Sequence, residues 1–132
     1  LLVFSAHGLP EAIVDRGDPY IEEVDATVAG VVERLQHPIE HVIAYQSKAG
    51  PVKWVAPDVR DVVARAAADG RTCLGIVPIS FVSEHVETLH ELDIQLAELA
   101  ADAGIAEFHR SRCLDVDPIT GPVLADVVEE YL

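Results

Sequence analysis

The chain has 132 residues, which predicts one domain large enough to bury a core. Half of the residues are hydrophobic but only 5% are aromatic, so Val, Leu, Ile and Ala must build the core, and the composition excludes a disordered chain. A formal net charge of −14 argues against a nucleic-acid partner, because an acidic surface repels phosphate.

The two cysteines, Cys73 and Cys113, form neither a CxxC motif nor a disulfide framework. This usage favours a reducing compartment and a cytoplasmic location. The sequence shows no signal-peptide pattern and no apolar run long enough to span a membrane. It contains no methionine and begins within an apolar run, which predicts that the chain is a piece of a longer protein.

Strand and helix patterns alternate along the chain. Apolar runs predict strands at 1–4, 42–45, 72–77 and 106–113, and helical spacing predicts helices at 20–35, 58–68, 84–103 and 118–132. Asp18 and Pro19 give a helix start signal, and Gly70 is a candidate helix C-cap. The alternation predicts the α/β class: a doubly wound three-layer sandwich around a four-stranded parallel sheet, in a single domain.

In such folds ligands bind at the carboxyl ends of the strands, so the loops after the first three predicted strands are the places to search. His7 follows the first strand beside Gly8, where a neutral imidazole can bind a metal ion or accept a proton. The alternative is a loop histidine that only caps a neighbouring backbone group. Trp54 follows a Gly-Pro loop, where it either walls a flat ligand or anchors local packing.

Three carboxylates are spaced to share one face of the predicted helix at 84–103. Glu84, Glu87 and Glu91 stand at i, i+3 and i+7. Such a row is either a solvated face or a route for divalent cations. His85 points about 100° away from Glu84 in a regular helix. Bringing His85 and Glu87 to one site therefore requires an irregular first turn, for example a π-bulge.

The remaining histidines and cysteines have no comparable setting. We interpret His37, His41, His90 and His109 as ordinary surface or partly buried residues. Cys73 and Cys113 fall in predicted strands and are expected in the core. The glycines form no phosphate-binding pattern and no serine lies in a GxSxG context, which disfavours nucleotide-binding and hydrolase functions.

Four strings, in order, resemble the ferrochelatase family and span most of the chain. They are Phe4-Ser5-Ala6-His7-Gly8-Leu9-Pro10; Arg16-Gly17-Asp18-Pro19-Tyr20; Gln46-Ser47-Lys48 with Gly50-Pro51 and Trp54; and Pro78-Ile79 with Phe81, Ser83, His85-Val86-Glu87-Thr88-Leu89 and Glu91-Leu92-Asp93-Ile94. The resemblance implies that residues 1–132 are the C-terminal half of a two-half chelatase, with a porphyrin cleft between the halves and the N-terminal half absent from this sequence.

The resemblance also implies an activity, the insertion of Fe²⁺ into a porphyrin to make haem, with protoporphyrin IX favoured over coproporphyrin III. It implies His7 and Glu87 as the paired catalytic and metal-site residues. Substrate-binding positions would be Ser5, Gln46, Trp54 and Phe81. Glu84, His85 and Glu91 would form a metal or proton path. Imidazole and carboxylate are both suitable ligands for ferrous iron.

The expected partners are a porphyrin, ferrous iron as substrate, and the N-terminal half of the same enzyme, through which the protein would also contact a membrane peripherally. A [2Fe–2S] cluster normally needs four ligands, so Cys73 and Cys113 do not support one within these residues. Two alternatives remain open: a cobalt or sirohydrochlorin-type chelatase, and a non-catalytic porphyrin- or metal-binding half-domain. We expect the isolated half to be inactive.

Overall fold

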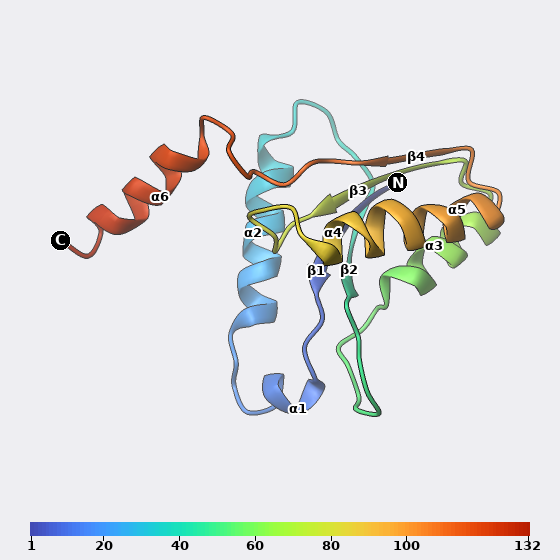
Figure 1. Cartoon of the computed structure of the whole chain (residues 1–132), viewed down its shortest axis with the longest axis horizontal. Helices are drawn as coiled ribbons and strands as arrows, with labels where there is room; N and C mark the ends of the chain where they lie inside the picture. Colours follow the sequence, from blue (N-terminus) through green and yellow to red (C-terminus); the bar gives the residue numbers. More distant parts are fainter.

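The computed structural model describes all residues, 1–132, and has a parallel sheet at its centre (Figure 1). The strands are β1 (Leu2–His7), β2 (His41–Gln46), β3 (Cys73–Pro78) and β4 (Glu107–Arg110). Their order across the sheet is β2-β1-β3-β4, and every neighbouring pair is parallel. The predicted four-stranded parallel sheet is confirmed.

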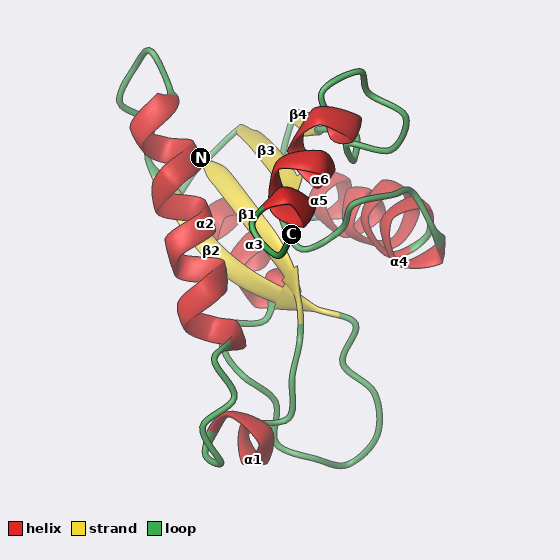
Figure 2. Ribbon diagram, turned by 90° about the vertical axis from the view of Figure 1, so that its left-hand side faces the viewer, coloured by secondary structure: helices red, strands yellow, loops and turns green.

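Helices cover both faces of the sheet, which gives the predicted three layers (Figure 2). The helical segments are α1 (Glu11–Val14), α2 (Tyr20–Arg34), α3 (Val59–Ala68), α4 (Val86–Leu89), the π-helix η1 (Glu91–Leu96), α5 (Ala97–Asp102) and α6 (Thr120–Glu129). α2 lies against one face, whereas α3, α4 and α5 lie on the other. No helix is both long and apolar enough to cross a membrane.

Strand alternation divides the core between the two faces. Val3, Leu74 and Ile76 point toward α3, η1 and α5, where they join a fully buried apolar cluster. Phe4 and Tyr45 point the other way and pack with residues of α2 in a second cluster. Each such buried side chain contributes about 2 kcal/mol relative to exposure, which fixes the register of the central strands.

Two helix ends carry the predicted signals, at Asp18 and at Gly70, whereas the helix predicted from Asp58 begins one residue later because Asp58 is its N-cap. Asp18 Oδ1 accepts a hydrogen bond from the Tyr20 N–H at the start of α2 (3.0 Å). The N-cap of α3 is Asp58, whose side chain accepts from the Arg60 N–H (2.9 Å). Gly70 lies just after α3 with a φ of 78°, the left-handed conformation that glycine adopts without a Cβ clash.

The sequence-based element boundaries need three corrections. The first strand continues past residue 4 to His7, because its backbone pairs with β2 as far as Gln46. The helix predicted at 84–103 is divided into α4, η1 and α5, and η1 is a π-helix. The last strand ends at Arg110 instead of residue 113.

Each cysteine meets half of its prediction, since Cys73 lies in a strand and Cys113 is buried. Cys113 is buried as expected, at 3% exposure, but it follows β4 instead of lying in it. Cys73 is exposed, so its expected place in the core is wrong. It opens β3 with its side chain on the face opposite Leu74 and Ile76, and that face is uncovered there.

Candidate active site

His7 is held by its backbone at the carboxyl end of β1. Its N–H donates to Ser80 Oγ (2.8 Å), and its carbonyl accepts from the Tyr20 hydroxyl (2.9 Å). Ser80 is placed there because the chain after β3 continues alongside β1, with the Ile79 N–H donating to the Ser5 carbonyl (2.9 Å). Burial raises the pKa of Tyr20, which keeps its hydroxyl protonated as a donor.

The imidazole of His7 meets the carboxylate of Glu87. Nδ1 lies 2.8 Å from Oε2, although the two residues are 80 positions apart in sequence. The side chains are 40% and 28% exposed, so the pair opens to solvent. The structure therefore brings together the two residues that the sequence marked as a catalytic and metal-binding pair.

Glu87 is presented by the short helix α4, which His85 caps. His85 has an extended backbone, and its Nδ1 accepts from the Glu87 N–H (3.2 Å). The Thr88 hydroxyl in turn accepts from the His85 N–H (3.0 Å). His85 thus lies beside Glu87 through a helix cap. The irregularity expected in the first turn is instead the π-helix η1, which begins after α4.

Gln46 joins β2 to the segment that carries the carboxylates. Its Oε1 accepts from the Ser5 hydroxyl (2.6 Å). Its Nε2 donates to the backbone carbonyl of Glu87 (2.7 Å) and to Glu91 Oε2 (3.2 Å). The Ser47 hydroxyl also donates to Glu91 Oε2 (2.8 Å). Ser5 and Gln46 are buried, so they lie behind the His7–Glu87 pair and hold it in place.

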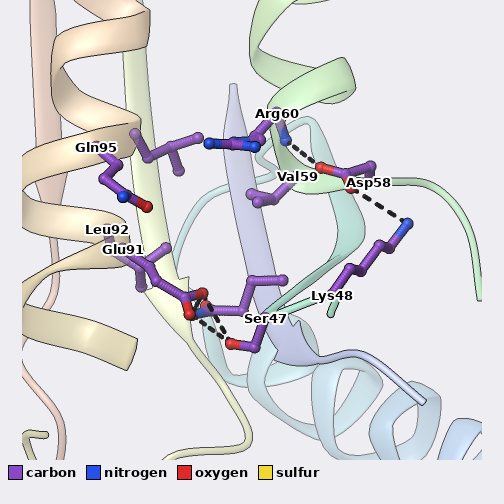
Figure 3. A pocket seen from close by; sticks show the side chains of 10 residues that line it. Ser47, Lys48, Asp58, Val59, Arg60, Glu91, Leu92 and Gln95 are labelled. Carbon is purple, nitrogen blue, oxygen red and sulfur yellow. Dashed lines mark hydrogen bonds and ion pairs between the residues drawn. The ribbon is translucent and has the colours of Figure 1, made fainter. Parts of the chain in front are cut away.

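A polar cavity of about 230 Å³ opens beside this network, between the end of β2, the start of α3 and η1 (Figure 3). Glu91 faces it with Ser47 on one side, and Lys48 pairs with Asp58 on the other (3.3 Å). Neither His7 nor Glu87 lines it. The cavity is smaller than the roughly 300–1,000 Å³ that encloses typical organic ligands, so it does not hold a macrocycle.

Glu84 does not share the face of Glu87 and Glu91. It precedes α4, and its carboxylate accepts from Arg110 (2.6 Å), from the Cys113 N–H (2.9 Å) and from the Thr88 hydroxyl (2.7 Å). Burial alone would raise the pKa of Glu84, but these hydrogen bonds and the guanidinium charge lower it to about 2. The predicted three-carboxylate row is therefore wrong at Glu84, which anchors α4 to β4.

The aromatic candidates lie around the His7 side chain and its loop. The Phe81 ring stands edge-on to His7, with centroids 6.3 Å apart, and lies 5.1 Å from the His85 ring. Trp54 packs against the loop after β1, where a Cβ on Gly8 would lie 3.4 Å from its ring and 2.7 Å from the Gln46 carbonyl oxygen. Glycine is therefore required for this close approach.

Sequence reasoning missed four residues that fix the pair: Ser80, Tyr20, Thr88 and Arg110. Tyr20 and Thr88 lie inside strings that resemble the family, so a role was detectable there. Ser80 and Arg110 carry no local signal. They are identified only by the pairing of β3 with β1 and β4, which brings distant segments together.

Comparison with known proteins finds relatives that match this chain over almost its whole length. The family model for ferrochelatase matches residues 1–132. Ferrochelatase of Geotalea daltonii is 48% identical over 128 residues, which cover 97% of this chain and 40% of the relative. Ferrochelatase of Thermosynechococcus vestitus is 47% identical over 133 residues, 100% of this chain and 34% of the relative. The chain thus spans well under half the length of these relatives.

Among solved structures, a CbiX protein from Marinobacter aquaeolei, assigned to cobalamin biosynthesis, has the same fold. The TM-score is 0.68 at 21% sequence identity, over 98% of this chain and 94% of that one. At this identity the likeness concerns the fold alone. The family match over every residue, together with relatives near half identical, establishes that the chain belongs to the ferrochelatase family.

Proposed function

We propose that the complete protein inserts Fe²⁺ into a porphyrin, protoporphyrin IX in preference to coproporphyrin III, and that residues 1–132 form the C-terminal half of its cleft. The contact between His7 Nδ1 and Glu87 Oε2, 2.8 Å apart at the carboxyl end of the sheet, carries the proposal. Family membership supplies the reaction class.

The reaction needs a proton acceptor and a place for a partly dehydrated cation. The porphyrin loses two N–H protons, Fe²⁺ loses its water ligands, and haem and two protons are the products. When His7 donates from Nδ1 to the Glu87 carboxylate, its Nε2 carries a lone pair. That nitrogen accepts a pyrrole proton, and the carboxylate stabilises the resulting imidazolium through a charge-assisted hydrogen bond.

The side chains of the site are suited to transferring a cation to the porphyrin. His7 and Glu87 supply two ligand types that ferrous iron accepts, which leaves further positions to water and to the porphyrin nitrogens. Glu91 is tied to Glu87 through Gln46, so a second carboxylate stands behind the pair at the polar cavity. We propose Glu87 and Glu91 as the cation path, with Glu84 excluded by its bonds to Arg110.

Apolar surface around the pair suits a flat macrocycle. Phe81 stands at His7, and Val82 and Val86 of the same segment are 57% and 68% exposed. These side chains offer one wall of a cleft, with Trp54 beside the loop after β1. The relatives are more than twice as long as this chain, and we propose that the additional length supplies the opposite wall.

The experiment is anaerobic insertion of Fe²⁺ into protoporphyrin IX by the complete protein, comparing wild type with His7→Ala and Glu87→Gln. Turnover should fall at least about 100-fold in both, the range for losing a positioned acid–base group, with porphyrin binding retained. His37→Ala and Glu98→Gln, at exposed positions away from the site, are matched controls. Normal turnover in both site variants would contradict these roles.

The second candidate function is insertion of cobalt into a sirohydrochlorin-type ring. It stays an alternative because the chain shares its fold with a protein assigned to cobalamin biosynthesis. Turnover of the same protein with Co²⁺ and sirohydrochlorin, alongside Fe²⁺ and either protoporphyrin IX or coproporphyrin III, separates the candidates. The proposal expects the highest kcat/KM with protoporphyrin IX and Fe²⁺.

A further inference from the structure

Three metal-ligating side chains meet at the amino ends of β3 and β4. The Cys73 thiol, a Glu107 carboxylate oxygen and an imidazole nitrogen of His109 lie within 4.8 Å of one another, and all three residues are exposed. We call this cluster the Cys73 triad. Nothing in the chemistry at His7 and Glu87 uses it.

The sheet register creates the triad. Cys73 pairs with Glu107 across the parallel strands, and Glu107 and His109, two positions apart in β4, project from the same face. The residue opposite His109 is Gly75, which leaves the imidazole unobstructed by a neighbouring side chain. A Cβ at Gly75 would also lie 3.0 Å from the Leu2 side chain.

The separations are close to those of a tetrahedral metal site. Two N or O ligands, each about 2.1 Å from a tetrahedral Zn²⁺, lie about 3.4 Å apart. When one of the two ligand atoms is a thiolate sulfur, the distance between them is about 0.2 Å longer. His109 Nε2 and Glu107 Oε2 are 3.5 Å apart. The ligand atoms lie within 4.8 Å of one another, so the thiol needs to come closer to the other two ligands by about 1.2 Å at most. Exposed side chains can make that adjustment by rotating.

We propose that the Cys73 triad binds one Zn²⁺, with water in the fourth position. A thiolate, an imidazole and a carboxylate form a donor set that zinc prefers, and three protein ligands with one water is a common open zinc site. One thiolate and one carboxylate balance the charge of the ion. The net charge of −14 also raises the local concentration of cations.

This site is separate from the proposed chelatase site. Leu2 pairs with Gly75, so Cys73 stands two residues before the level of Leu2, whereas His7 lies five residues beyond it. At the rise of a β-strand the two sites are roughly 20 Å apart along the sheet. The proposal therefore stands or fails independently of haem synthesis.

The test uses the complete, reduced, metal-free protein and Co²⁺ as a spectroscopic probe for the zinc site. Wild type should give a sulfur-to-cobalt charge-transfer band that Zn²⁺ displaces. Cys73→Ser should abolish the band. His109→Gln and Glu107→Gln should weaken Co²⁺ binding at least about tenfold, since even outer-shell substitutions cost that much.

Matched controls are Cys113→Ala, His37→Ala and the double variant His7→Ala/Glu87→Gln, each of which should keep the band. A second readout needs no variant: Zn²⁺ should slow alkylation of Cys73, read by peptide mass mapping. Absence of the band in wild type, its persistence in Cys73→Ser, or alkylation of Cys73 at the same rate with and without Zn²⁺ would overturn the proposal.

Discussion

At the scale of single residues, the ion pair of Glu84 and Arg110 has the clearest energetic consequence. Arg110 is 11% exposed and binds Asp93 as well as Glu84, so it ties β4 both to η1 and to the segment that precedes α4. Removing one partner of such a pair leaves the other charge insufficiently compensated. Glu84→Gln should therefore lower the free energy of unfolding by about 3 kcal/mol at neutral pH, measured by urea denaturation.

The pH dependence of that loss follows from the lowered pKa of Glu84. Its folded value of about 2 lies below the ordinary 4.5, so the stabilisation is fully present above pH 4.5 and disappears as the pH falls toward 2. The stability difference between wild type and Glu84→Gln should shrink over that window. Glu98→Gln, on the exposed side of α5, is the matched control. A constant difference from pH 6 to pH 2 would refute the assignment.

The sequence identified the residues of the central pair but not how their neighbours act. His7 was detectable because it follows the first predicted strand, and Glu87 because it lies near the start of a predicted helix. Both residues lie within strings that resemble the family. Ser5 and Gln46 were expected to bind the substrate; both are buried, and Gln46 bonds to the Ser5 hydroxyl and to the Glu87 carbonyl. Burial at a strand end depends on which segments cover it, and strand register is a property of the whole sheet.

At the scale of elements, the segment from 84 to 103 shows what periodicity cannot predict. Val86, Leu89, Leu92 and Leu96 fit one regular helix, yet Val86 and Leu89 are exposed and Leu92 and Leu96 are buried. The π-helix changes the direction of side chains between the two pairs. It also keeps Glu91 at Gln46 and Ser47. A π-helix of this kind cannot be recognised from the spacing of apolar residues in the sequence.

The helix cap by His85 leads to a prediction about α4. His85→Ala should lower the free energy of unfolding by about 1 kcal/mol, because the Glu87 N–H loses its acceptor. Asn is a favoured N-cap, so His85→Asn should recover most of that loss. Because the cap positions Glu87, turnover of the complete protein should be higher in His85→Asn than in His85→Ala.

The same two variants distinguish a cap from a chemical role. In the neutral ring, an Nδ1 that accepts from the Glu87 N–H leaves the proton on Nε2, so His85 is not poised to accept another. If the Asn variant regains stability while its turnover remains as low as that of the Ala variant, the imidazole itself takes part in metal or proton transfer.

At the scale of the molecule, the sheet was predictable and the place of the last helix was not. Alternating strands and helices specify a parallel sheet, whatever the details of the loops. α6 follows the same pattern, but it extends away from the sheet (Figure 1) and buries none of its residues. Its apolar side chains Val123, Leu124, Val127 and Val128 are 46–56% exposed. A contiguous apolar surface of this kind marks an interface.

The exposed face of α6 and the proposed single wall beside His7 lead to two predictions for the isolated 132-residue chain. It should show no measurable Fe²⁺ insertion, because a porphyrin on one wall stays in water and is not held in a strained geometry. It should also self-associate through α6, whereas Leu124→Glu with Val128→Glu should make it monomeric in sedimentation experiments. The complete protein should turn over under the same conditions. Turnover by the monomeric double variant would show that residues 1–132 contain the whole catalytic apparatus, and the two-wall cleft would then be wrong.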